Sequence, residues 1–298
     1  MRNIIEALIA EGGWPRDRLD ADYNARATVG DRFADEMDAY RRASDAARAA
    51  ALSHADILYD AQSGQTLDLF GVDPGGAPRP LFVFLHGGYW RALSKRESAM
   101  MADMLAKAGI ATAVIDYRLA PDVSLAEIVR EIRAALAFLW REGARYGIDP
   151  DRIHVGGSSA GGHLAGMLIA DGWHAAFDVP PDVVKSALLL SGLFELAPLA
   201  ASFSQEWLAL DAEAIAALSP IRHLPAAGCP VFIAWADGEA PGFKRQSRAF
   251  FDVWTGSGFI ATAFEVPERN HFNLLMDLAD RQSTLSRALL QLIDTRTE

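Results

Sequence analysis

Short apolar runs alternate with helical patterns along the chain from residue 55 onward. The runs are bounded by glycine, proline or aspartate, as expected for strands that are buried on both faces of a sheet. Two of them flank Ser63-Gly64 and predict an opening hairpin, Ala55–Tyr59 and Thr66–Phe70. The other predicted strands are Leu81–Leu85, Ala111–Ile115, Arg152–Val155, Ser186–Leu190, Val231–Trp235 and Ile260–Val266. This alternation predicts an α/β fold with a mostly parallel central sheet flanked by helices.

Helices are predicted between the strands, and two segments fall outside the alternation. The clearest helix begins at Ser124, which forms an S-x-x-E capping box with Glu127. Residues 1–54 look helical and mixed in charge, with Asp31–Leu52 the longest stretch, and residues 193–226 follow a predicted strand. Both segments are candidate cap elements, the alternative being solvated surface helices. Without repeats or a flexible linker, the whole chain is expected to form one domain with an N-terminal extension and a cap insertion.

The composition of the chain limits which binding partners and which cellular compartment we expect for the protein. The formal net charge of −11 argues against nucleic acid or an anionic membrane as the main partner and leaves a small molecule. Cys229 is the single cysteine, which excludes an internal disulfide and fits a reducing compartment. The N-terminus lacks the pattern of a signal peptide, and no apolar run approaches a membrane span of about 18 residues. We therefore expect a cytoplasmic protein; a homodimer stays open beside a monomer.

A candidate nucleophile follows a predicted strand directly. Gly157–Gly161 reads G-S-S-A-G and matches G-x-S-x-G; it comes just after Arg152–Val155 and opens a helix to about Ala170. A strand–turn–helix context is what the nucleophile elbow of the α/β-hydrolase fold requires. Ser159 is the serine with a glycine two positions away on each side, so it is the predicted nucleophile. The alternative is a glycine-rich turn with an incidental serine.

A second glycine-rich loop follows another predicted strand. His86–Trp90 reads H-G-G-Y-W directly after Leu81–Leu85. Glycines let a backbone turn its N–H groups towards a developing oxyanion, as in the HGGG-type loop of lipases and esterases. We expect Gly88 and Tyr89 to supply donors together with Ala160, the residue after the nucleophile.

The same loop also carries one histidine and two aromatic side chains. His86 is expected to hold the loop by a ring hydrogen bond rather than to act as a base. Tyr89 and Trp90 either line the acyl pocket or pack beneath the loop, and the pattern does not choose between these alternatives.

The base and the acid should follow the serine along the chain, with the acid before the histidine. Four histidines come after the serine: His163, His174, His223 and His271. His271 alone lies between the last predicted strand and the final helix, so it is the expected general base. The acid should follow Val231–Trp235, where Asp237 and Glu239 compete. Spacing favours Glu239, because an acid must clear the strand end before it turns inward; either carboxylate can hold the imidazole.

Several motifs resemble those of one enzyme family. His86–Trp90 matches the H-G-G-x-W motif of the arylformamidases, or kynurenine formamidases, which are α/β-hydrolases related to the carboxylesterases. Tyr23–Ala27 is close to their Y-N-N-R-A, Phe243–Arg248 is similar to F-x-R-Q-S-R, and Asn270–Phe272 matches N-H-F. With Gly156–His163, the likeness spans nearly the whole chain from about residue 20.

The resemblance also implies roles for single residues. The family carries its acid four positions before the phenylalanine of F-x-R-Q-S-R, which corresponds to Glu239 rather than Asp237. It implies no metal and no organic cofactor. Asp116 is expected to be structural. The chain has Glu239 where animal formamidases have aspartate, and Ala25 replaces the second asparagine of the N-terminal motif.

These residues lead to one favoured function and two alternatives. The favoured one is a serine hydrolase that cleaves an aryl formamide of the N-formyl-L-kynurenine type through an acyl-enzyme. The alternatives are a carboxylesterase for small acyl or aryl esters and an inactive homologue that binds a ligand. Trp90, Tyr23 and Trp207 are candidates for the lining of the substrate pocket.

Overall fold

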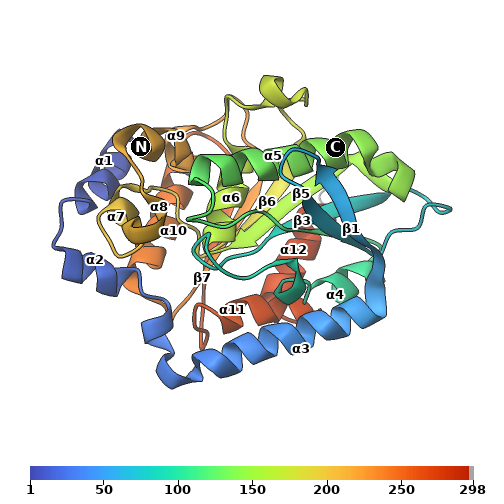
Figure 1. Ribbon diagram of the computed structural model, residues 1–298, viewed down its shortest axis with the longest axis horizontal. Coiled ribbons are helices and arrows are strands. Elements are labelled where there is room, and N and C mark those ends of the chain that lie inside the picture. Colours follow the sequence, from blue (N-terminus) through green and yellow to red (C-terminus); the bar gives the residue numbers. More distant parts are fainter. Residues whose placement is uncertain (295–298) are drawn as a thin grey trace.

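A single eight-stranded sheet organises residues 1–294, which are the residues that the computed structural model describes (Figure 1). The strands are β1 (Leu52–Asp60), β2 (Gln65–Phe70), β3 (Arg79–Leu85), β4 (Ala111–Ile115), β5 (Ile148–Ser158), β6 (Val184–Leu190), β7 (Val231–Ala236) and β8 (Ala261–Val266). Their order across the sheet is β1-β2-β4-β3-β5-β6-β7-β8. β2 pairs antiparallel with β1 and β4, and all other pairs are parallel. The predicted mostly parallel sheet and opening hairpin are therefore confirmed.

The burial of each strand follows its place in the sheet. β3 and β4 lie in the interior and consist almost wholly of buried residues, whereas β8, at one edge, alternates between more and less exposed positions. A strand covered on both faces needs a continuous apolar run, while an edge strand needs only one apolar face. In the register of β3 with β5, Leu85 lies beside Gly157. The segments that follow these two strands therefore start next to each other.

Helices cover both faces of the sheet (Figure 1). The α-helices are α1 (Arg2–Glu11), α2 (Arg16–Asp22), α3 (Phe33–Ala51), α4 (Ala102–Lys107), α5 (Leu125–Glu142), α6 (Ala160–Ile169), α7 (Ala197–Ala200), α8 (Gln205–Leu208), α9 (Ala212–Leu218), α10 (Pro241–Gly256), α11 (Asn273–Met276) and α12 (Thr284–Asp294). One hydrophobic cluster joins α5, α6 and α10 to the sheet, and another joins α4, α11 and α12 to it. As predicted, α5 begins after Ser124, whose hydroxyl accepts the backbone N–H of Glu127 at 3.2 Å.

The first two helices and the segment after β6 pack together at one end of the molecule (Figure 1). The carboxylate of Asp20 in α2 accepts the backbone N–H of Phe203 at 2.6 Å, and Arg16 pairs with Glu206 at 2.7 Å. Arg245 of α10 binds both Glu11 and Asp22. Helix α3 instead runs along the face of the sheet that α4 and α11 cover, and it lies close to both of these helices. In residues 1–294, no helix combines the length and the apolar character that crossing a bilayer demands.

Candidate active site

Ser159 occupies a sharp turn between β5 and α6. Its backbone has φ 60° and ψ −119°, a conformation that is strained for a residue with a side chain. Small neighbours allow the turn: a Cβ at Gly157 would lie 2.2 Å from the carbonyl oxygen of Gly161, and a Cβ at Gly161 would lie 2.0 Å from that of Leu85. Both glycines of the motif are thus required by close backbone contact. The predicted strand–turn–helix context is present, with Ser159 5% exposed.

The loop after β3 has an unusual backbone directly beside this turn. Gly88, Tyr89 and Trp90 have φ of 98°, 52° and 57°, so three successive residues lie in the left-handed region. A Cβ at Gly87 would be 3.4 Å from the Cβ of Ser159, which places the loop against the serine. Two left-handed residues with large side chains cost on the order of 1–3 kcal/mol each and persist only where their surroundings hold them. Contacts from other segments therefore have to hold Tyr89 and Trp90 in this conformation.

Tyr89 is fixed at both ends by segments distant in sequence. Its hydroxyl donates to the backbone carbonyl of Tyr23, and its own carbonyl accepts the indole N–H of Trp207 at 3.0 Å. The ring makes edge contacts with Phe203, Trp207 and Phe243. Burial, with the nearby Glu239 carboxylate adding to it, raises the pKa of the Tyr89 phenol well above its ordinary value, so the hydroxyl keeps its proton and stays a donor.

Trp90 packs beneath the loop. Its side chain is fully buried, and its indole N–H donates to Nδ1 of His163 at 3.2 Å. Because Nδ1 is the acceptor, the other ring nitrogen of His163 carries the proton and donates to the carbonyl of Leu218 at 2.8 Å. Burial lowers the pKa of His163 to about 4, which keeps the imidazole neutral. Helix α6, this loop and the end of α9 are therefore joined through one histidine.

His86 holds the loop from its other side. Its Nδ1 lies 2.9 Å from the carbonyl oxygen of Gly87 and 3.1 Å from the hydroxyl of Tyr117, and that hydroxyl donates to the His86 carbonyl at 2.7 Å. The two rings stack with centroids 4.1 Å apart. Burial lowers the pKa of His86 to about 4. Neighbouring Asp116 accepts the backbone N–H of Lys95 at 2.7 Å, a structural contact.

The structure brings Glu239 and His271 together. Glu239 follows β7, His271 follows β8, and Nδ1 of the imidazole lies 2.8 Å from Oε2 of the carboxylate. Both side chains are almost wholly buried. Since the two strands are parallel to β5, the loops that carry Ser159, Glu239 and His271 all leave the carboxyl edge of the sheet.

Asp237 has a different role in the same loop. Its carboxylate accepts the backbone N–H groups of Glu268 at 3.0 Å and Arg269 at 3.2 Å. These hydrogen bonds, that of Glu268 above all, lower the pKa of the Asp237 carboxyl. It therefore fastens the loop after β8, which carries His271, to the loop that carries Glu239.

The three candidates for the pocket lining differ in exposure. Tyr23 and Trp90 are completely buried and offer no side-chain surface to a ligand. Tyr23 accepts a hydrogen bond from the amide of Gln246 at 3.2 Å and donates to Glu11 at 3.4 Å. Trp207 is only partly buried, and the guanidinium of Arg91 lies 4.3 Å from its ring. The hydrophobic pattern of the sequence contains no signal for these polar contacts.

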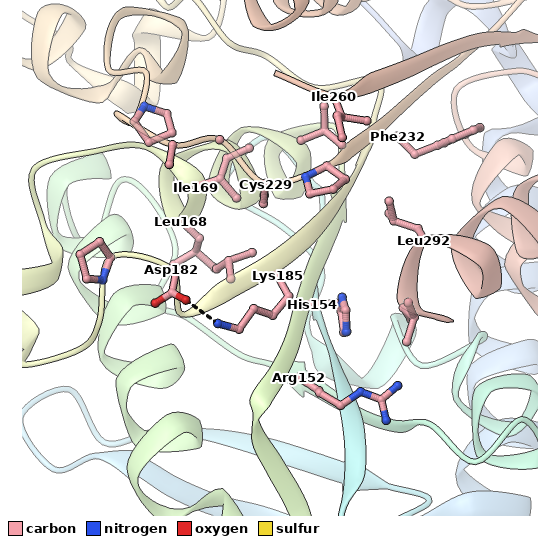
Figure 2. A pocket seen from close by; sticks show the side chains of 18 of the residues that line it. Arg152, His154, Leu168, Ile169, Asp182, Lys185, Cys229, Phe232, Ile260 and Leu292 are labelled. Carbon is pink, nitrogen blue, oxygen red and sulfur yellow. Dashed lines mark hydrogen bonds and ion pairs between the residues drawn. The ribbon is translucent and has the colours of Figure 1, made fainter. Parts of the chain in front are cut away.

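A hollow of about 960 Å³ lies at the opposite edge of the sheet (Figure 2). Residues from the amino ends of β5 to β8 line it, among them Arg152, Lys185 and Ile260. His154 also borders it, but its Nε2 is sealed from solvent and without a hydrogen-bond partner in the described residues, so a ligand in the hollow would not reach that atom. Lys185 pairs with Asp182 at 2.8 Å. The hollow is therefore separate from the edge that carries Ser159.

The chain is similar in sequence and fold to several known hydrolases. Residues 67–185 match the family model BD-FAE. Kynurenine formamidase of Danio rerio is 27% identical over 93% of this chain and 96% of its own length, and that of Salmo salar is 27% identical over 91% and 92%. Among solved structures, a putative thioesterase from Silicibacter sp. TM1040 is 28% identical with a TM-score of 0.77, covering 92% of this chain and 98% of its own.

Structures with lower identity share the fold. Esterase B from Lactobacillus rhamnosis, solved with an inhibitor, is 22% identical with a TM-score of 0.71, covering 90% of this chain and 96% of its own. The sheet order, the elbow and these likenesses all indicate the same type of protein. The chain is a serine hydrolase of the α/β-hydrolase type that resembles the kynurenine formamidases along most of its length.

Proposed function

We propose that this protein hydrolyses an aryl formamide of the N-formyl-L-kynurenine type, with Ser159 as nucleophile, His271 as general base and Glu239 as the acid of the triad. The observation that carries the proposal is the 2.8 Å contact between His271 and Glu239 at the sheet edge where Ser159 lies on its strained turn. A carboxylate on Nδ1 keeps the proton on that nitrogen and leaves Nε2 free to take the serine proton.

The reaction proceeds in two steps. In the first, His271 takes the proton of Ser159 while the serine oxygen attacks the formyl carbon, and the negative charge on the formyl oxygen is held by backbone N–H groups of Gly88, Tyr89 and Ala160. His271 then protonates the aryl amine, the C–N bond breaks and a formyl-enzyme remains. In the second step, a water molecule that gives its proton to His271 attacks this ester, and formate leaves as Ser159 regains its proton.

An aryl formamide is the substrate class that we favour. Homology along most of the chain to kynurenine formamidases supports the same substrate class.

A carboxylesterase acting on small acyl or aryl esters is the second candidate. It is supported by the esterases among the structural neighbours, because the same nucleophile and oxyanion donors serve both reactions. The two candidates differ in the leaving group, an amine in one and an alcohol or phenol in the other, and the esterase also takes acyl groups larger than formyl.

The deciding experiment is a paired steady-state assay of N-formyl-L-kynurenine and a short-chain aryl ester, with Ser159→Ala measured alongside. A kcat/KM for the formamide far above that for the ester, lost in Ser159→Ala, is the expected result. Turnover of the ester alone would remove the formamide and leave the esterase. Full activity in a folded Ser159→Ala protein would overturn the nucleophile itself.

A further inference from the structure

The left-handed backbone of the loop Gly88–Trp90 is held mainly by contacts from outside the loop. Trp90 is fixed by His163, and the phenol of Tyr89 reaches the backbone of Tyr23. The Trp90 carbonyl also accepts the backbone N–H of Ala120 at 2.7 Å. A further restraint on the Tyr89 backbone comes from α8, where the indole N–H of Trp207 donates to the Tyr89 carbonyl at 3.0 Å. Without such restraints, the strain in two large left-handed residues would favour a different backbone conformation.

The Trp207 bond holds the peptide that directly follows the proposed donor residue Tyr89. The side chain of Tyr89 is fixed by its hydroxyl and by its ring contacts, while the position of its carbonyl oxygen reports its ψ angle. The peptide between Gly88 and Tyr89, whose N–H is a proposed donor, shares the Tyr89 Cα with the peptide that Trp207 binds, and its own carbonyl accepts the backbone N–H of Arg91 at 3.0 Å. The Trp207 bond therefore fixes the Cα about which the donor peptide turns. Trp207 lies in the segment after β6. Its contact with Tyr89 therefore comes from outside the two loops at the serine, which follow β3 and β5.

We propose that Trp207 is a positioning residue that orients the oxyanion donors through the Tyr89 carbonyl, so that docking of the segment 193–226 completes the oxyanion hole. The inference rests on the proposed function. Trp207 takes no part in bond making; it acts through Tyr89. Its contribution is therefore larger in the transition state, where the oxyanion exists, than in the ground-state complex.

The test compares Trp207→Phe with Trp173→Phe. The first variant keeps an aromatic ring against Phe203 and Tyr89 but loses the N–H donor. Trp173 is the matched control, since its buried indole donates to the carbonyl of Leu168 at 3.3 Å at the far end of α6. Both proteins are assayed for kcat and KM and for inhibition by an aryl trifluoromethyl ketone, which adds to the serine and leaves an oxyanion in the hole.

Trp207→Phe should lower kcat by about tenfold or more with KM changed by less than about threefold, since a small misplacement of a catalytic group costs up to about a hundredfold. Its affinity for the ketone should fall by the same factor as kcat/KM. Trp173→Phe should keep both values. If Trp207→Phe keeps kcat/KM and ketone affinity within about twofold of wild type while Ser159→Ala is inactive, the inference is overturned and the proposed function stands. Activity in Ser159→Ala would instead remove the proposed function.

Discussion

Nδ1 of His271 lies 2.8 Å from Oε2 of Glu239, while the carboxylate of Asp237, two residues before Glu239, accepts the backbone N–H groups of Glu268 and Arg269. Two carboxylates that lie two positions apart in one loop thus have different roles. One faces the imidazole and the other anchors the chain that carries it.

Glu239→Gln should lower kcat by about a thousandfold or more, because an amide no longer holds the imidazole in the tautomer that accepts the serine proton. Asp237→Asn should lower thermal stability and change kcat only slightly, since its contacts are to the backbone of Glu268 and Arg269. Steady-state kinetics and melting curves of the two variants measure this. The reverse ranking of the two kcat values would assign the acid to Asp237.

Gly88→Ala should lose at least about a hundredfold in kcat, the effect of one lost oxyanion donor. An added Cβ would lie 2.2 Å from the carbonyl oxygen of Ala92, so the loop has to move. Gly109→Ala is the matched control: Gly109 also has a positive φ, 78°, but its Cβ would meet nothing within 4 Å. The control should share the conformational strain and the lower melting temperature yet keep its kcat. Equal losses of kcat in both would remove the loop from catalysis.

Acid should destabilise the fold between about pH 6.5 and pH 4. Burial lowers the pKa of His86, His154 and His163 to about 4 from the ordinary 6.5. The unfolded chain therefore binds more protons than the folded chain in this range, and each group removes about 1.4 kcal/mol of stability per pH unit as pH falls. Above about pH 6.5 these groups leave the stability independent of pH.

His154→Gln is the variant that isolates one of these contributions, because His154 lies far from the proposed site. Its free energy of unfolding, measured with urea at several pH values, should fall less steeply towards pH 4 than that of the wild type. The exposed His54 provides the control, and His54→Gln should follow the wild-type curve. Identical slopes for His154→Gln and wild type would contradict the prediction.

Arg222→Met should destabilise the protein by about 3–5 kcal/mol, because it leaves a buried carboxylate without its partner. Arg222 binds both oxygens of Glu195, at 2.7 and 2.6 Å, and the Glu195 side chain has no exposed surface. Arg2→Met removes an ion pair with Glu6 whose members are 90% and 57% exposed, and it should leave the free energy of unfolding nearly unchanged. Chemical denaturation of both variants makes the comparison.

The strands were predictable because apolar runs carry enough local information to place them. The strand predicted at Ala111–Ile115 is β4 without change, and the others agree within a few residues. The main difference is β5, which begins at Ile148 rather than at Arg152. Asp149-Pro150-Asp151 has the composition of a turn, and only the pairing of Ile148 with Arg79 on β3 extends the strand through it.

The elbow was predictable because its motif is local, with both glycines within two positions of Ser159 and directly after a predicted strand, although a Cβ at Gly161 would also meet the distant Leu85. The contacts that hold the second loop were not. Tyr89 meets Tyr23 across 66 positions and Trp207 across 118, and neither pairing leaves a trace in periodicity or composition. Trp90 is an example. The H-G-G-x-W motif indicates that this tryptophan has a role, but only the fold shows that its side chain packs against His163 rather than against a ligand.

The spread of the site along the chain has a consequence for how the protein is made. Contacts to the loop at Gly88–Trp90 begin at Tyr23, and the proposed base is supplied by His271, shortly before the last helix. Because β8 joins the sheet at its edge, pairing only with β7, a nascent chain can build the other seven strands before the histidine leaves the ribosome. Such a chain has the proposed nucleophile but not yet the proposed base. Hydrolysis by the proposed triad therefore cannot begin until His271 has been synthesised and has reached its place in the fold.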